Sequence, residues 1–132
     1  MHIDGECFCG AIAYEATLVS PEIGLCHCSD CQAFSGSPYR ATVTAMKGDF
    51  RVTRGTARAY VKTGSSGRKS AQYFCETCGS NLYRIAEGEE KVGIRIGTIR
   101  QRHALTPARQ TWIESGLHWT QDLTALPVTP PS

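Results

Sequence analysis

Hydrophobic and polar residues alternate along much of the chain, and this alternation predicts most of the secondary structure. A period of two is typical of β-strands that bury one face against a core. The alternation covers residues 12–18, 39–45, 50–53 and 92–96. Shorter strands are predicted at residues 57–63, 70–75 and 81–85.

Turn signals that contain glycine separate these predicted strands. They lie at Lys47-Gly48-Asp49, at Arg54-Gly55, and at residues 64–67 and 87–89. The segment 109–119 has a helical pattern, which Gly116 limits to about two turns. Short strands divided by turns predict an all-β fold of short antiparallel strands.

The length and composition are those of one folded domain. The chain has 132 residues, 41% hydrophobic and 20% charged. This composition excludes that the chain as a whole is a disordered tail, a collagen-like chain or a coiled coil. No stretch approaches the roughly 18 to 20 apolar residues of a membrane span, and no secretion signal is evident. We therefore expect a cytoplasmic protein with a single domain over residues 1–126 and a flexible proline-rich tail over residues 127–132.

Seven cysteines carry the chemical information in this sequence. An odd number fits a closed disulfide framework poorly, and clustered thiols in a reducing compartment more often bind metal or carry out chemistry. A pair one residue apart on a strand points both sulfurs to one face, while a pair two residues apart forms a turn that can chelate one ion. The three groups are Cys7-x-Cys9, Cys26-x-Cys28-x2-Cys31 and Cys75-x2-Cys78.

The flanking residues divide the cysteines into two predicted zinc sites. Glycine follows Cys9 and Cys78, where a left-handed turn would fold the backbone around a sulfur, whereas Gln32 follows Cys31. Four thiolates close a zinc site and three leave one position open. We predict a closed structural site on Cys7, Cys9, Cys75 and Cys78. We predict an open, functional site on Cys26, Cys28 and Cys31.

The open site has three alternative interpretations. The second zinc could be purely structural, closed by a water, another side chain or a partner. His27 is a candidate ligand, but in an extended segment it points away from its neighbours, so we expect it to be packed or hydrogen-bonded. A redox pair at Cys28 and Cys31 lacks the strand-to-helix context of thioredoxin-type proteins.

The residues around the cysteines match a known family. Order, spacing and flanking residues agree together in residues 7–14 (CFCGAIAY), 26–31 (CHCSDC, followed by Ser35-Gly36-Ser37) and 74–82 (FCETCGSNL). On these motifs the chain resembles the glutathione-dependent formaldehyde-activating enzyme family, also called centromere protein V-like. The resemblance covers residues 5–98, with a weaker match through Trp112 and Trp119.

The resemblance implies a zinc-binding β-tent fold, with two zinc ions on the same two groups of cysteines. It also implies a carbon–sulfur lyase activity, in which formaldehyde condenses with glutathione to S-(hydroxymethyl)glutathione. An open zinc with three thiolates is a soft Lewis acid that can bind a fourth sulfur, and it would deprotonate a thiol whose free pKa is about 8.5. We therefore expect a small-molecule thiol such as glutathione, and a small aldehyde, as substrates.

A non-catalytic zinc-binding module for a protein or nucleic-acid partner is the alternative function. A basic stripe on adjacent predicted strands could attract nucleic acid through Arg51, Arg54, Arg58 and Lys62. Acidic residues dilute that field, and few aromatic residues are available for base stacking. Neither nucleic acid nor a membrane is therefore the expected partner.

No catalytic acid or base is assigned from the sequence. His103 and His118 are expected to be surface or packing residues. Ser35, Gly36 and Ser37 could line the pocket of the three-cysteine site with polar donors, or they could form a plain Ser-Gly turn. Candidate cations for the carboxylates of a tripeptide are Arg40, Arg68 and Lys69.

Overall fold

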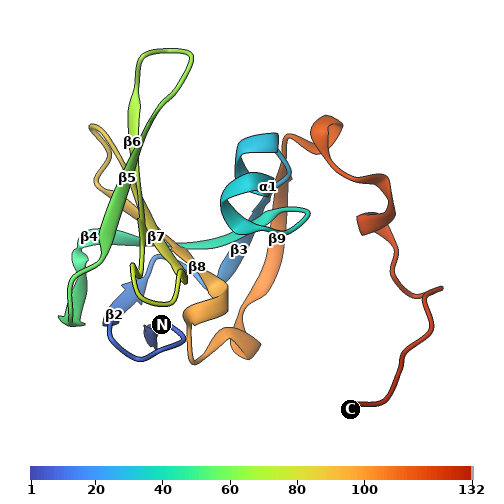
Figure 1. Ribbon diagram of the computed structural model, residues 1–132, viewed down its shortest axis with the longest axis horizontal. Helices are drawn as coiled ribbons and strands as arrows, with labels where there is room; N and C mark the ends of the chain where they lie inside the picture. The colour runs from blue at the N-terminus through green and yellow to red at the C-terminus, as the bar shows by residue number, and fades with distance from the viewer. Residues whose placement is uncertain (132) are drawn as a thin grey trace.

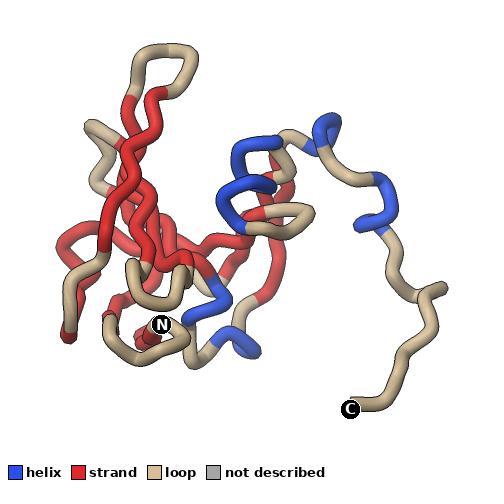
Figure 2. Tube along the Cα trace, viewed as in Figure 1, coloured by secondary structure: helices blue, strands red, loops and turns tan. Residues whose placement is uncertain are grey.

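The computed structural model describes residues 1–131 and arranges nine strands in one connected sheet (Figures 1 and 2). This confirms the all-β fold predicted from the alternation. The first five strands are β1 (His2–Glu6), β2 (Ala13–Leu18), β3 (Glu22–Cys26), β4 (Arg40–Arg54) and β5 (Arg58–Thr63). The others are β6 (Lys69–Phe74), β7 (Asn81–Ala86), β8 (Lys91–Arg95) and β9 (Thr106–Thr111).

The strands follow the order β1-β2-β4-β8-β7-β6-β5, and each neighbouring pair is antiparallel. Strand β3 pairs with β4 on one side and with β9 on the other. The β3–β9 pair is parallel, which departs from the purely antiparallel prediction. A parallel pair needs a long connection, and here most of the sheet lies between the two strands in sequence.

Strand β4 is continuous, although the sequence predicts a turn at Lys47-Gly48-Asp49. The turn signal marks a β-bulge instead: the partner of β2 shifts from Phe50, opposite Ala16, to Ala45, opposite Leu18. A bulge bends and twists a strand without ending it. One long bent strand therefore contacts β2, β3 and β8.

The helix predicted over residues 109–119 does not form. Residues up to Thr111 belong to β9, which pairs with β3, and two short 3-10 turns follow at Ile113–Ser115 and His118–Gln121. Tertiary strand pairing overrides the weak helical pattern. The one α-helix of the described chain, α1 (Ser29–Ser35), begins after the capping residue Cys28 and was not predicted.

The C-terminal segment leaves the sheet and extends beside it (Figure 1). Residues 127–131 form neither helix nor strand. Ser132, the last residue of the predicted proline-rich tail, lies outside the described residues. Among the residues that are described, no helix has the length and apolar character needed to cross a membrane.

One face of the sheet builds the hydrophobic core, where Val43, Leu82 and Ile94 are fully buried. Tyr14, Phe50, Tyr83 and Tyr73 form a chain of aromatic contacts within it or against it. The alternate residues of the same strands face the other way, and two of them, Gln72 and Arg95, are also buried. The second face of the sheet is therefore covered as well, by polar rather than apolar packing.

Gly5 occupies a position where the sheet closes tightly. It pairs with Tyr14 in β2 and with Ile99 beyond β8. A Cβ atom at Gly5 would stand 2.5 Å from Tyr14 Oη and nearer still to the Thr98 carbonyl oxygen. Tyr14 is held in place there by a 2.7 Å hydrogen bond with Thr98 Oγ1.

We expect Gly5→Ala to lower the free energy of unfolding by about 1–3 kcal/mol, because overpacking forces backbone and Tyr14 to move. Gly48→Ala is the matched control, since a Cβ at Gly48 meets no atom within 4 Å. Urea denaturation of both variants measures the difference. Equal stability of the two variants would contradict the tight closure.

Candidate metal centres

Two turns from distant parts of the chain bring four cysteines together. Cys7 and Cys9 follow β1, and Cys75 and Cys78 lie between β6 and β7. In each turn the backbone folds back, with Gly10 N donating to Cys7 O and Gly79 N donating to Cys75 O. Both glycines have a φ of 79°, in the left-handed region that the sequence predicted for them.

The sulfur spacing in this group fits a zinc ion. All four sulfur atoms lie within 4.8 Å of one another. Cys9 Sγ is 3.7 Å from both Cys7 Sγ and Cys75 Sγ. A tetrahedral zinc site with bonds of about 2.3 Å places its sulfurs about 3.8 Å apart. The group can therefore hold one metal ion with four sulfur ligands, as the spacing in the sequence suggested.

The crowded sulfurs of this group cannot all ionise unaided. Hydrogen bonds from the Ser80 side chain and backbone lower the pKa of Cys78 to about 5. A hydrogen bond from the Ala11 N–H lowers the pKa of Cys9, but burial and the neighbouring thiols outweigh it and raise this pKa to about 11. Clustered thiols thus share their protons unequally, and a bound cation is what allows every sulfur to become a thiolate.

The other three cysteines meet where β3 joins α1. Cys26 ends the strand, Cys28 caps the helix and Cys31 lies in its first turn. Cys31 N donates to Cys28 Sγ over 3.3 Å, and the three sulfurs lie within 4.8 Å of one another. No further His, Cys, Asp or Glu side chain within residues 1–131 joins this group.

The environment of the three-cysteine group separates the acidities of its thiols. Burial raises the pKa of Cys31 to about 12, although the positive charge of Arg40 acts in the opposite direction. Burial also acts on Cys26, but hydrogen bonds from Cys28 N and the Thr111 side chain outweigh it and lower its pKa. Cys31 therefore carries a proton at neutral pH that a metal ion would displace.

His27 is not a ligand of this group, which confirms the prediction from strand geometry. Its ring is 1% exposed and packs edge-on against Tyr39. Its Nε2 atom lies 2.8 Å from Gln110 Oε1 in β9. His27 therefore joins β3 to β9 on the side away from the sulfurs. His103 and His118 are exposed, as expected.

Two cavities give access to the three-cysteine group. An inner cavity of about 190 Å³ is lined by all three cysteines together with Phe34, Arg40, Arg84 and Trp112. An outer cavity of about 450 Å³ lies between the start of α1 and the β5–β6 hairpin, and Cys28 and Trp112 line it as well. Lys62 and Asp30 form a 2.5 Å ion pair and border both cavities. The open side of the cysteine group thus faces space large enough for a small molecule.

Trp112 stands at this entrance in a strained conformation. Its φ of 55° is the only positive φ of a non-glycine residue within the described chain, and its side chain is 60% exposed. A bulky residue in the left-handed region costs roughly 1–3 kcal/mol, a cost that often marks a functional site. The sequence does not predict that Trp112 adopts this conformation at the cavity entrance, because backbone strain there depends on how β9 ends.

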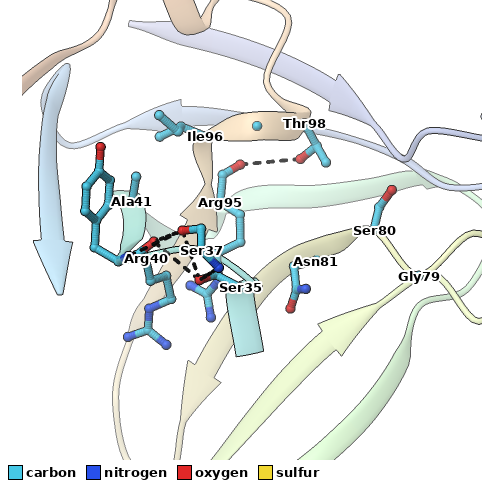
Figure 3. Close-up of a pocket in the computed structure, with 12 residues that line it drawn as sticks. Ser35, Ser37, Arg40, Ala41, Gly79, Ser80, Asn81, Arg95, Ile96 and Thr98 are labelled. Atoms are coloured by element: carbon cyan, nitrogen blue, oxygen red, sulfur yellow. Dashed lines mark hydrogen bonds between the residues drawn. The ribbon is translucent and has the colours of Figure 1, made fainter. Parts of the chain in front are cut away.

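The predicted polar residues of the site lie in three different places. Arg40 lines the inner cavity, whereas Arg68 and Lys69 border a different cavity beneath the β5–β6 hairpin. Ser35 and Ser37 do not line the cavities of the cysteine group. They line a further cavity of about 450 Å³, between α1, β4 and the end of β8, which Arg40 also borders (Figure 3). Of the two interpretations of Ser35-Gly36-Ser37, the structure thus favours the plain turn, because the turn after α1 carries the serines past the sulfurs.

The basic stripe that could have attracted nucleic acid is neutralised. Each of its four cations forms an ion pair with a carboxylate on a neighbouring segment. The pairs are Arg51–Glu15, Arg54–Glu6, Arg58–Glu76 and Lys62–Asp30. Such pairs contribute little to stability at a surface, but they cancel the local positive field that phosphate binding requires.

Comparison with known proteins agrees with this architecture. The model of a family described as glutathione-dependent formaldehyde-activating enzyme matches residues 2–115. A Schizosaccharomyces pombe protein named as an uncharacterized lyase is 28% identical over 80 residues. That match covers 61% of this chain and 55% of the relative, so the chain spans little more than half of the relative's length.

A solved structure shares the fold. The crystal structure of a Rhodobacter sphaeroides protein superposes with a TM-score of 0.62 at 24% identity. The superposition covers 80% of this chain and 99% of the other. At this identity the likeness supports the arrangement of the strands and no statement about activity.

We expect the two cysteine groups to respond differently to substitution. Cys78→Ser should lose one zinc and unfold the chain, because structural zinc contributes about 10–16 kcal/mol in model peptides, comparable with a small domain's whole stability. Cys28→Ser should lose the other zinc and stay folded. Metal analysis and circular dichroism measure both effects. Equal unfolding of the two variants would contradict the division into a structural and an open site.

Zinc uptake by the three-cysteine group should release protons and strengthen as the pH rises. Cys31 holds its proton up to a pKa of about 12, so each unit of pH below that value makes metal binding harder. Calorimetric titration of zinc at pH 6, 7 and 8, in buffers of different ionisation enthalpy, counts the protons when the protein retains only the zinc of its four-cysteine group. An affinity independent of pH would contradict the protonated state of Cys31.

Proposed function

Since the chain belongs to the glutathione-dependent formaldehyde-activating enzyme family, we propose that it is a zinc-dependent carbon–sulfur lyase. The proposed substrates are a small-molecule thiol of the glutathione type and a small aldehyde, or the adduct of the two. The lyase name of the Schizosaccharomyces pombe relative supports the same class of reaction. The seven free thiols fit a reducing compartment, for which we propose the cytoplasm.

One observation carries this proposal above the others. The three-cysteine group has no fourth His, Cys, Asp or Glu within residues 1–131, and its sulfurs face a cavity. A structural zinc site is closed by four protein ligands, whereas a catalytic one keeps a position free. The four-cysteine group satisfies the first description, and the three-cysteine group satisfies the second.

The chemistry follows from this difference. A zinc ion with three thiolate ligands would supply a soft Lewis acid that binds a thiol and lowers its pKa toward neutrality. Cys26, Cys28 and Cys31 would hold that ion, and the walls of the inner cavity would exclude bulk water. The substrate sulfur would attack the carbonyl carbon and the carbonyl electron pair would move to oxygen. That oxygen would then take up a proton, which replaces the one that the thiol released on binding. The product is the S-(hydroxymethyl) adduct when the aldehyde is formaldehyde.

The entrance residues position the two reactants. Trp112 and Phe34 give the inner cavity aromatic walls, and Lys62 and Asp30 border its mouth. Holding thiol and aldehyde in contact removes most of the entropic cost of a reaction between two molecules. The aldehyde needs little room, so the cavity volume is available mainly to the thiol.

We expect the zinc-loaded protein to accelerate exchange between free formaldehyde and S-(hydroxymethyl)glutathione. Exchange spectroscopy with ¹³C-formaldehyde and glutathione measures the rate directly. Cys28→Ser, which should keep the structural zinc and the fold, is expected to bring the rate down to that of the uncatalysed solution. A wild-type protein with two bound zinc ions that leaves the rate unchanged would favour the non-catalytic zinc module instead.

A further inference from the structure

Three arginines lie on the polar face of the sheet, next to the three-cysteine group. They come from strands that are neighbours in the sheet: Arg40 from β4, Arg84 from β7 and Arg95 from β8. Arg40 stands directly across from Cys26 in the β3–β4 pair. Cross-strand partners project to the same face with Cβ atoms about 5 Å apart. The strand register thus places a guanidinium group beside the sulfurs.

Two of the three arginines are occupied by the protein itself. Arg95 is 7% exposed and donates to Gln72 Oε1 over 2.7 Å and to Thr42 Oγ1 over 3.3 Å. Arg84 donates from Nε to Ser70 Oγ over 2.8 Å, and its Nη1 lies 3.9 Å from a Glu89 oxygen. Both side chains are therefore fixed in place by strands of the same sheet.

Arg40 is different, because no side chain or backbone group within residues 1–131 accepts a hydrogen bond from its guanidinium group or forms an ion pair with it. Its Nε atom is buried without a partner. A buried polar donor without a partner costs free energy, and the cost is larger for a charged group. In Figure 3 the guanidinium groups of Arg40 and Arg95 extend to the same side of the strands.

The charges around the cavity do not balance. The positive charge of Arg40 contributes, after burial, to lowering the pKa values of Arg84 and Arg95. Three thiolates around one zinc would carry a single net negative charge, against two guanidinium groups on the cavity wall, Arg40 and Arg84, and a third, Arg95, that donates to the wall residue Gln72. Glu89 offsets part of the excess at Arg84, and Asp30 at the mouth is paired with Lys62. An anion inside the cavity would relieve the remaining repulsion.

We propose that Arg40 forms an anion subsite that binds the carboxylate of the thiol substrate. This rests on the proposed function, since the sulfur of the same molecule would occupy the open metal position. Arg40 and the three cysteines line one cavity of about 190 Å³, so the carboxylate lies only a few bonds from the sulfur. A planar guanidinium group binds a carboxylate through two parallel hydrogen bonds. Arg40 is thereby a specificity-determining residue for mercaptocarboxylates.

The test compares two thiols, 3-mercaptopropionate and its methyl ester, which differ in charge and by one methyl group. Cobalt replaces zinc in the three-cysteine group, because sulfur binding to Co²⁺ changes the visible absorption. We expect the acid-to-ester ratio of affinities to be at least about tenfold higher in wild type than in Arg40→Gln, as for a lost charged hydrogen bond. Comparing this ratio between proteins cancels the intrinsic difference in thiol acidity.

Two further variants separate a direct effect from a loss of structure. Arg40→Lys keeps the charge and should retain part of the preference for the acid. Arg100→Gln is the matched control, since Arg100 is paired with Asp4 and its side chain is 73% exposed. It should bind both probes as the wild type does. Metal analysis confirms that each variant holds the same number of ions. A wild-type protein that binds acid and ester with equal strength overturns the subsite, whatever the variants do.

A probe without sulfur distinguishes failure of this inference from failure of the proposed function. Propionate should shift the ¹⁵N signal of Arg40 Nε in a saturable way, whereas propanol should not. If propionate shifts the signal but neither thiol alters the cobalt absorption, the anion subsite stands and the thiol chemistry fails. If both thiols bind equally and propionate has no effect, the thiol chemistry stands and the subsite fails.

Discussion

The structure depends on the meeting of four sulfur atoms that repel one another as thiolates. Cys9 and Cys75 are 66 positions apart in the sequence, yet their sulfurs are 3.7 Å apart. Ionised sulfurs repel one another at that distance unless they share a cation, and without a cation some of them must stay protonated. The two turns that carry them connect β1 to the β6–β7 pair, which lie far apart in the strand order. A metal ion held by all four sulfurs would therefore cross-link remote parts of the sheet.

The second cysteine group differs because of its local backbone. In the four-cysteine group, each pair sits in a turn closed by a left-handed glycine. The three-cysteine group runs from the end of β3 into α1, so the chain continues away from the sulfurs instead of folding back around them. Cys28 of this group thus lines a cavity bordered by the β5–β6 hairpin and Trp112. The same ligand chemistry can serve stability in one place and substrate binding in the other.

A basic composition suggests a positively charged surface, but several surface cations are paired here and arginines gather beside the cysteines. Arg51 and Arg54 on β4 and Arg58 on β5 are each paired with a carboxylate at the surface, so these three cations do not form a continuous positive stripe. Guanidinium groups gather instead on the inner polar face of the sheet, around the cysteines. Buried charge is costly unless it is compensated. The arginines beside the three-cysteine group therefore fit a cavity that receives an anion.

The sequence by itself determined the features that arise within a few residues. Alternation predicted most strands because side chains on a strand change face at every step, and the cysteine spacing predicted both groups because chelating turns are local. The sequence could not predict the conformation of residues 109–119 or the parallel β3–β9 pair. Pairing with a strand distant in the sequence decides whether these residues form part of β9 or a helix. The sequence also could not show that Gln72 and Arg84 line one cavity with the cysteines, because an alternating polar residue is expected to face solvent unless another element covers it. Only the tertiary structure, by laying α1 and the β3–β9 pair beside that face, turned these polar positions into the wall of a site.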